Sequence, residues 1–110
     1  MVRPGKPVRG STTGRPIMAA LDLLGRRWTL RILWELQGGP VGFRALQQRC
    51  GDLSPTVLNT RLGELREAGI VEQDDSKAHQ LTPLGRDLYE ALSPLQTWAN
   101  RWAEQAAESS

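Results

Sequence analysis

Residues 43–68, FRALQQRCGDLSPTVLNTRLGELREA, decide the fold that we expect for this 110-residue chain. Apolar residues at helical spacing predict a short helix over residues 43–50 and a second helix that begins at Ser54-Pro55 and runs to residue 68. Gly51 and Asp52 form a tight turn between the two helices. A helix, a tight turn and a helix indicate a helix-turn-helix motif. The apolar face of the second helix consists of Leu58, Leu62 and Leu65.

The residues on both sides of this motif extend it into a small, mainly helical fold. Two short strands are expected over 70–73 and 80–82, with the polar tip 74–78 between them, and this hairpin is a candidate wing. Two helices are expected before the motif, over 16–24 and over 27–37. Thr82 and Pro83 should begin a single helix that reaches about residue 108. We therefore expect a mainly α fold with a small β-hairpin, a winged helix-turn-helix with a long C-terminal dimerisation helix.

The C-terminal helix is longer than a domain of this size can cover. Its apolar stripe continues to Trp98 and Trp102, four residues apart, and part of that stripe should be buried against a second chain. Trp28 and Trp34 belong either to the core or the dimer interface, or to an aromatic pocket for a planar ligand. The expected dimer interface comprises Ile17, Leu21, Leu95, Trp98 and Trp102.

The outward face of the second motif helix carries the candidate base contacts. Its amino-terminal half presents small, hydrogen-bonding side chains, and this is the half that meets base edges in helix-turn-helix proteins. An asparagine can pair with an adenine edge, and hydroxyls serve bases or phosphates. Ser54 is either a helix cap or a DNA contact, and the other side chains are either base contacts or a solvated face. The expected base contacts are Ser54, Thr56, Asn59 and Thr60.

Candidate contacts to the DNA backbone lie on three segments. Arg44 and Gln48 fall on the exposed side of the first motif helix, and Lys77 and His79 of the hairpin could meet an adjacent groove. Arg61, beside the inward stripe, either reaches a phosphate or pairs with a nearby acid. Gly63, inside the second helix, indicates either a close DNA backbone or tight helix packing. The expected backbone contacts are Arg44, Gln48, Arg61 and Lys77.

Composition narrows the class of protein. Cys50 is the only cysteine and His79 the only histidine, so an internal disulfide is impossible, and a zinc site or a nucleophile with its base is improbable within one chain. We expect no enzyme activity, no metal and no cofactor, and we expect Cys50 to be buried and inert. No apolar run is long enough to cross a bilayer, so the protein should be soluble and cytoplasmic, with no membrane partner.

Charge is distributed unevenly along the chain. Residues 1–34 contain seven basic residues and one acidic residue, whereas residues 35–110 contain seven basic and eleven acidic residues. A basic leading segment suits a polyanionic partner. Residues 1–14 are rich in Pro, Gly, Ser and Thr and should form a flexible basic arm before a single domain over 15–110.

Several blocks in order resemble the HxlR-type family of bacterial transcriptional regulators. They are LLGRRWTLRIL at 23–33, GPVGFRAL at 39–46, LSPTVL at 53–58, RLGEL at 61–65, AGIV at 68–71 and LTPLG at 81–85, so the resemblance covers residues 15 to 102. It implies a winged-helix dimer that is paired through its terminal helices, binds double-stranded operator DNA and usually represses. Family members often carry a cysteine where this chain has Arg15, so redox sensing does not carry over, and a common arginine is replaced by Gly42.

The expected function is therefore sequence-specific binding of double-stranded DNA by a homodimer that regulates transcription as a repressor, with a small-molecule effector as a further candidate partner. The alternative is a winged-helix dimer that binds protein or a small hydrophobic ligand. A protein-binding winged helix often carries acids on its recognition face, and Glu64 and Glu67 are such acids, but they lie in the carboxyl-terminal half of the second motif helix, away from the expected base contacts.

Overall fold

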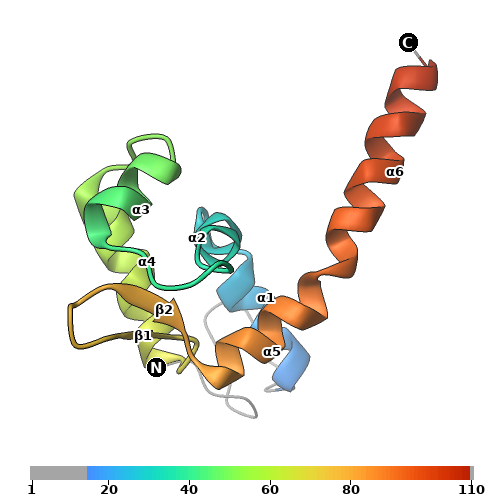
Figure 1. Cartoon of the computed structure of the whole chain (residues 1–110). Helices are drawn as coiled ribbons and strands as arrows, with labels where there is room; N and C mark the ends of the chain where they lie inside the picture. Colours follow the sequence, from blue (N-terminus) through green and yellow to red (C-terminus); the bar gives the residue numbers. More distant parts are fainter. Residues whose placement is uncertain (1–14, 110) are drawn as a thin grey trace.

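The computed structural model describes residues 15–109, so the expected basic arm over 1–14 lies outside the described residues. The described chain is mainly helical with one two-stranded hairpin, as the sequence predicts (Figure 1). None of the helices within 15–109 is long and apolar enough to span a bilayer. The elements, in chain order, are α1 (Pro16–Leu24), α2 (Thr29–Glu35), α3 (Phe43–Arg49), α4 (Pro55–Glu67), β1 (Val71–Gln73), β2 (His79–Leu81), α5 (Pro83–Leu92) and α6 (Pro94–Ser109).

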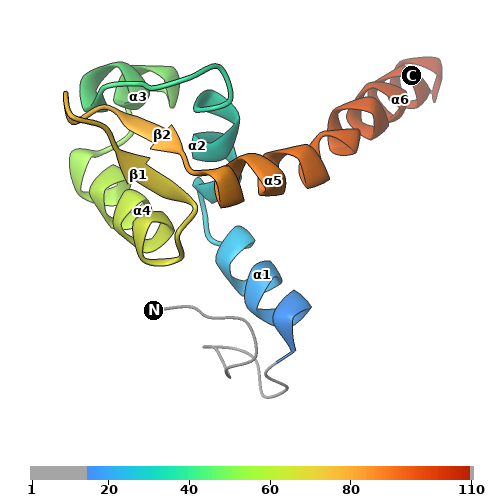
Figure 2. The same cartoon turned by 60° about the horizontal axis from the view of Figure 1, so that its bottom comes forward.

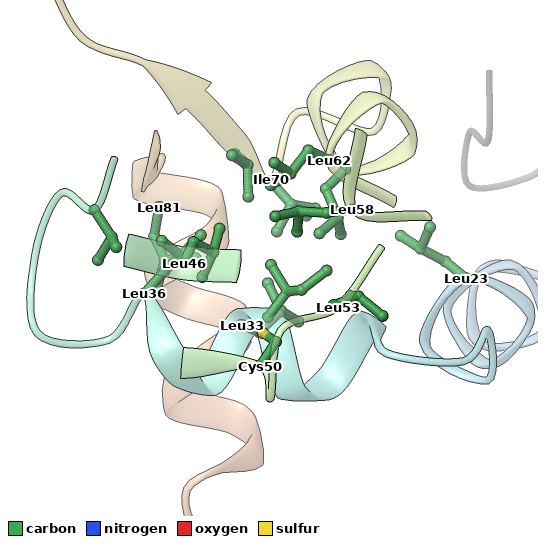
Figure 3. Close-up of a cluster of buried hydrophobic side chains, with 14 residues drawn as sticks. Leu23, Leu33, Leu36, Leu46, Cys50, Leu53, Leu58, Leu62, Ile70 and Leu81 are labelled. Atoms are coloured by element: carbon green, nitrogen blue, oxygen red, sulfur yellow. The ribbon is translucent and has the colours of Figure 1, made fainter. Parts of the chain in front are cut away.

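The hydrophobic core fixes the orientation of α4. Leu58, Leu62 and Leu65 of α4 are completely buried, which confirms the predicted inward face. Leu33 of α2 and Leu46 of α3 belong to the same cluster (Figure 3). Burial of each leucine contributes about 1.5–3 kcal/mol, so turning α4 about its axis would be costly. The opposite face of α4 is thereby held toward solvent.

The turn between α3 and α4 combines two backbone conformations that favour short or absent side chains. Gly51 and Asp52 have φ values of 73° and 59°, in the left-handed region that glycine and aspartate tolerate best. Ser54 then caps α4, because its Oγ accepts a hydrogen bond from the Val57 amide at 3.3 Å. The helix, turn and helix predicted from the sequence are therefore present.

The wing hairpin is tied to the helical part by a third extended segment. Strands β1 and β2 pair antiparallel, with Val71 opposite Leu81 and Gln73 opposite His79. His79 also exchanges two backbone hydrogen bonds with Val41, at 2.8 and 2.9 Å, just before α3. Both strands differ by one residue from the ranges expected from the sequence, because β1 begins at Val71 and β2 begins at His79.

The C-terminal segment is two helices, so the prediction of one helix from residue 83 to 108 was wrong. Helix α5 ends at Leu92, Ser93 forms a turn, and α6 begins at Pro94. Proline has no amide hydrogen, and its ring blocks the carbonyl four residues earlier, which is that of Glu90. The Ser93 amide and hydroxyl donate to the Glu90 carbonyl instead, at 3.3 and 3.0 Å. Helix α6 projects away from the rest of the described chain (Figures 1 and 2).

Helix α2 is also shorter than the expected range 27–37. Trp28 has a φ of 77° and therefore stands outside the helix, which begins at Thr29. This left-handed conformation is unusual for a bulky residue. Trp28 packs partly buried against the core, whereas Trp34 keeps 42% of its surface exposed.

Candidate DNA-binding surface

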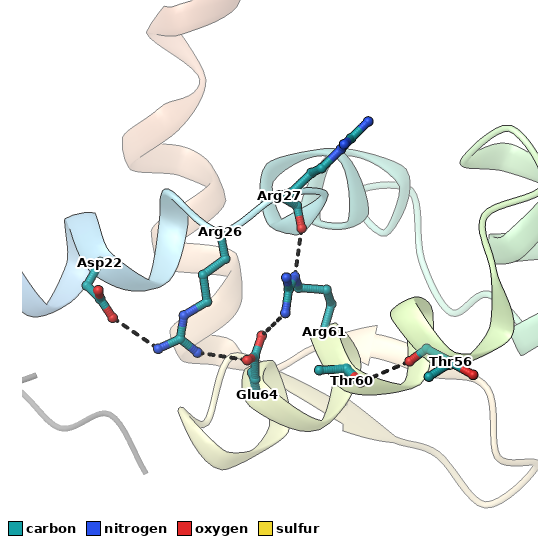
Figure 4. A network of polar contacts seen from close by, with 7 residues as sticks. All are labelled: Asp22, Arg26, Arg27, Thr56, Thr60, Arg61 and Glu64. Carbon is teal, nitrogen blue, oxygen red and sulfur yellow. Dashed lines mark hydrogen bonds and ion pairs between the residues drawn. The ribbon is translucent and has the colours of Figure 1, made fainter. Parts of the chain in front are cut away.

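The exposed face of α4 presents the predicted base-reading side chains. Thr56, Asn59 and Thr60 are all exposed, opposite the buried leucines. The Thr60 hydroxyl donates to the Thr56 carbonyl at 2.9 Å (Figure 4), so its oxygen remains an acceptor toward a partner. Ser54 is exposed as well, although its Oγ is engaged as the helix cap. These four side chains lie along the amino-terminal half of α4.

Arg44 and Gln48 are exposed on α3, as the sequence predicts, and Lys77 is exposed at the tip of the wing. Lys77 has a φ of 68°, a conformation that the surrounding tip stabilises. The Asp74 Oδ1 accepts hydrogen bonds from the Ser76 amide, the Ser76 hydroxyl and the Ala78 amide at 2.7–3.0 Å. The Ser76 hydroxyl is the main cause of a lowered Asp74 carboxyl pKa. These hydrogen bonds hold the backbone of the wing tip that carries Lys77.

Arg61 is turned toward the protein and pairs with a neighbouring acid. Its Nε donates to the Arg27 carbonyl at 2.7 Å, and its Nη1 lies 3.0 Å from a Glu64 carboxylate oxygen (Figure 4). Of the two roles that the sequence leaves open, the structure shows pairing with an acid. The contact of Arg61 with the DNA backbone stays a prediction, and the contacts within the chain engage its Nε and Nη1.

Glu64 also reaches a residue that sequence reasoning missed. Its second carboxylate oxygen lies 3.1 Å from Arg26 Nη1, and Arg26 Nη2 lies 3.0 Å from Asp22 at the end of α1. The pairs Asp22 with Arg26 and Arg61 with Glu64 stand four and three residues apart and are therefore local in sequence, and the second pair lies within α4. The contact between Arg26 and Glu64 joins distant parts of the chain, and no local spacing indicates it.

His79 is buried, so the expectation that it meets an adjacent groove was wrong. Only 3% of its surface is exposed. Arg66 Nη1 lies 3.1 Å from His79 Nε2, which places the proton of the neutral ring on Nδ1, an atom without a hydrogen-bond partner among the described residues. Burial lowers the pKa of His79, and the neighbouring Arg66 charge lowers it further.

The pKa of His79 predicts a stability that falls in mild acid. The unfolded chain takes up a proton near the ordinary histidine pKa of about 6.5, whereas the folded chain resists it. The contribution of His79 to the free energy of unfolding is therefore fully present above that pH and is lost as the pH falls from 7 toward 5. Denaturant unfolding at several pH values measures this decrease. His79→Gln should show a flatter profile over that window, and equal slopes for the two proteins would contradict the assignment.

Apolar side chains of α1 and α6 remain uncovered. The predicted interface residues keep 49–63% of their surface exposed, and the rings of Trp98 and Trp102 stack with centroids 5.3 Å apart. A further apolar cavity of about 370 Å³ lies where α2 meets α5 and the start of α6. Leu30, Trp34, Tyr89, Leu92 and Leu95 are among the residues that line it. The exposed interface candidates are Ile17, Leu21, Leu95, Trp98 and Trp102.

Cys50 does not offer a reactive thiol on this surface. It ends α3 with only 2% of its surface exposed, and burial raises the pKa of its thiol. The neighbouring Arg31 charge opposes that shift and the Glu35 charge reinforces it. The thiolate is the nucleophilic form of cysteine, so the prediction of a buried cysteine is confirmed and its raised pKa accords with low reactivity.

An exposed second helix of a helix-turn-helix, followed at once by a hairpin, defines the winged helix-turn-helix class of protein. Solved structures of this class share the fold. The quinone-bound YodB of Bacillus subtilis has a TM-score of 0.71 and 32% sequence identity, covering 77% of this chain and 96% of that one. A regulator from Enterococcus faecalis, described as of the MarR family, has a TM-score of 0.74 and 27% identity, covering 94% and 99%. The expected fold class is confirmed.

The chain belongs to the HxlR-like helix-turn-helix family, whose model matches residues 23–107. The resemblance noted from the sequence is thus confirmed. Among curated proteins, the uncharacterised HTH-type transcriptional regulator Rv3095 of Mycobacterium tuberculosis is 37% identical over 95 residues, which cover 81% of this chain. The match spans 60% of the length of that relative.

Proposed function

We propose that this chain is a transcriptional regulator that binds double-stranded DNA sequence-specifically as a homodimer and acts as a repressor. The observation that carries the proposal is the exposed face of α4, where Thr56, Asn59 and Thr60 stand opposite a fully buried leucine face. A recognition helix needs this combination, because its core side must be rigid while its outer side enters the major groove. Membership of the HxlR-like family supports the proposal.

The side chains divide into two roles on the duplex. Ser54, Thr56, Asn59 and Thr60 would read base edges, with Asn59 placed to pair bidentately with an adenine. Arg44, Gln48 and Lys77 would contact phosphates on either side. The predicted contact of Arg61 is kept apart from this set, since its guanidinium holds Glu64 and the Arg27 carbonyl.

The dimer would form through the exposed apolar faces of α1 and α6. Leu21 and Trp98, each about half exposed, represent the two faces. A second copy of the same chain supplies matching apolar surface by two-fold symmetry. Each protomer would then present one α4, so the operator should contain two half-sites whose centres lie about 34 Å apart or a multiple of that spacing.

A salt series with a randomised duplex pool tests the proposal. Arg44 and Lys77 provide two cationic phosphate contacts for each chain, hence four for a dimer. The logarithm of the binding constant should therefore fall against the logarithm of salt concentration with a slope of about −4. Sequencing of the retained duplexes should yield a motif with two related halves. Weak binding without any enriched motif would reject the proposal.

An Asn59→Ala variant in the same assay tests the base-reading role of α4. Selection should relax at one position of each half-site, corresponding to about 1–3 kcal/mol of lost discrimination. Asn100→Ala on α6 removes the same side chain from an exposed position outside the proposed contact surface and should leave the motif intact. An unchanged motif for Asn59→Ala would remove Asn59 from the base-reading set.

A small apolar effector is a second candidate partner, favoured by the cavity between α2, α5 and α6. Its volume of about 370 Å³ falls in the range of small-molecule sites. One structural relative, YodB, was solved with a bound quinone. Binding in an apolar cavity is nearly indifferent to salt, which separates it from binding of DNA phosphates. The protein-binding alternative is weakened, because the Glu64 carboxylate is already paired with Arg26 and Arg61.

A further inference from the structure

Glu64 sits at the centre of a charge network that joins α4 to α1. One carboxylate oxygen lies 3.0 Å from Arg61 and the other 3.1 Å from Arg26, which in turn lies 3.0 Å from Asp22 of α1 (Figure 4). The four side chains keep only 22–27% of their surface exposed. Water screens such pairs less than it screens fully exposed ones. The charges of the network therefore interact more strongly than those of a fully exposed ion pair.

The same network holds the strained junction between α1 and α2. Trp28 at this junction has a φ of 77°, and a bulky residue adopts that conformation only when surrounding contacts enforce it. The preceding carbonyl, that of Arg27, accepts the Arg61 Nε hydrogen bond at 2.7 Å. Arg27 itself lies over the Trp28 ring, 5.4 Å from its centroid. Helix α4 thus contacts the junction through Arg61, and it contacts the end of α1 through the pair of Glu64 with Arg26.

The two ends of this network carry different proposed tasks. Glu64 follows Thr60 by one helical turn on α4, the helix proposed to read bases. Asp22 follows Leu21 on α1, which is exposed and proposed to meet the second protomer. We propose that Glu64 is a positioning residue, which couples the placement of α1 in the dimer to the orientation of α4 on DNA. This inference rests on the proposed function.

Electrostatics alone and loss of positioning predict different changes in DNA binding when Glu64 is replaced, which makes the positioning role testable. Replacing Glu64 with glutamine removes a negative charge from α4 and leaves the positive charges of Arg26 and Arg61 less neutralised. Charge alone would then strengthen binding to every duplex, irrespective of sequence. Loss of positioning would instead reduce the preference for the correct sequence. The ratio of the Kd for a shuffled duplex to the Kd for the selected operator separates the two effects.

The experiment measures this ratio for the full-length protein and its variants, with circular dichroism and thermal melting as controls of folding. Glu64→Gln and Arg26→Gln should each lower the ratio about tenfold. The double variant should lower it no further, because both substitutions break the same contact between Arg26 and Glu64, which joins α1 to α4. Glu90→Gln removes the same charge from an exposed position on α5 and should leave the ratio unchanged. A purely structural role would weaken binding to both duplexes equally.

The measured ratios distinguish a failure of the proposed function from a failure of the positioning role. A wild-type ratio near one would reject the proposed function and this inference with it. With a wild-type preference established, an unchanged ratio in folded Glu64→Gln and Arg26→Gln, an additive double variant or an equal loss in Glu90→Gln would overturn the positioning role alone. If Glu64→Gln fails to fold, Arg26→Gln decides, since it leaves the sequence of α4 intact.

Discussion

Gly85→Ala is expected to lower the free energy of unfolding by about 3 kcal/mol or more. Gly85 lies buried in the first turn of α5, and an added Cβ would stand 2.1 Å from the Ile70 carbonyl oxygen and 3.1 Å from its carbon. These are backbone atoms, so no side-chain rotation relieves the clash. The Ile70 carbonyl also accepts the Thr82 amide at 3.0 Å, and moving it would break the link between wing and α5. Denaturant unfolding measures the loss.

The same substitution at Gly63 provides the matched control. An added Cβ there would meet nothing closer than the Arg66 guanidinium at 4.0 Å. Alanine is the better residue inside a helix, so Gly63→Ala should stabilise the protein by about 1 kcal/mol. Opposite signs from one chemical change would verify how closely α5 packs on the wing. Wild-type stability in Gly85→Ala would show that this packing is wrong.

The double variant Trp98→Ala/Trp102→Ala is expected to dissociate the proposed dimer. The two rings form a stacked apolar pair that is about half exposed in a single chain. Tryptophans at the centre of an interface commonly contribute at least about 2 kcal/mol each, so loss of even one should raise the dimer Kd roughly 30-fold. Alanine favours the helix, and α6 should therefore persist. Sedimentation over a range of concentrations measures the association.

Asn100→Ala, two residues from each ring on α6, is the control for this experiment and should associate like the wild type. The dissociated variant should also bind a duplex with two half-sites more weakly than the wild type, yet bind a single half-site with unchanged affinity. A wild-type protein that stays monomeric at tens of micromolar, or a double variant that associates normally, would refute the interface.

Local periodicity in the sequence was sufficient to predict the helix-turn-helix and the face of α4 that points to solvent. Leu58, Leu62 and Leu65 recur at helical spacing, and the burial of all three leaves Asn59 on the outer face. The prediction of a single C-terminal helix failed for an identifiable reason. Its apolar stripe runs on through Leu92 and Leu95, and this continuity outweighed Pro94, although proline inside a helix removes a hydrogen bond.

Other features depend on register or on contacts far apart in sequence. A strand expected from residue 80 excludes His79, whereas the observed strand includes it and turns it inward, and successive residues of a strand point to opposite faces. The contact between Arg26 and Glu64 appears only after α1 and α4 are placed together. Gly63 also needed the structure, because its open surroundings exclude tight packing within the described chain as the reason for glycine.

Under the proposed function, the bend at Ser93 and Pro94 separates two kinds of information in the gene. Codons for α4 would specify which bases the protein prefers, whereas codons for the bend and α6 would specify the distance and angle between the two recognition helices of the proposed dimer. A substitution at the bend would alter the spacing of acceptable operators without altering the half-site. Duplicated copies of the gene could therefore diverge toward operators with the same half-site sequences at a new spacing, through changes at a few residues remote from DNA.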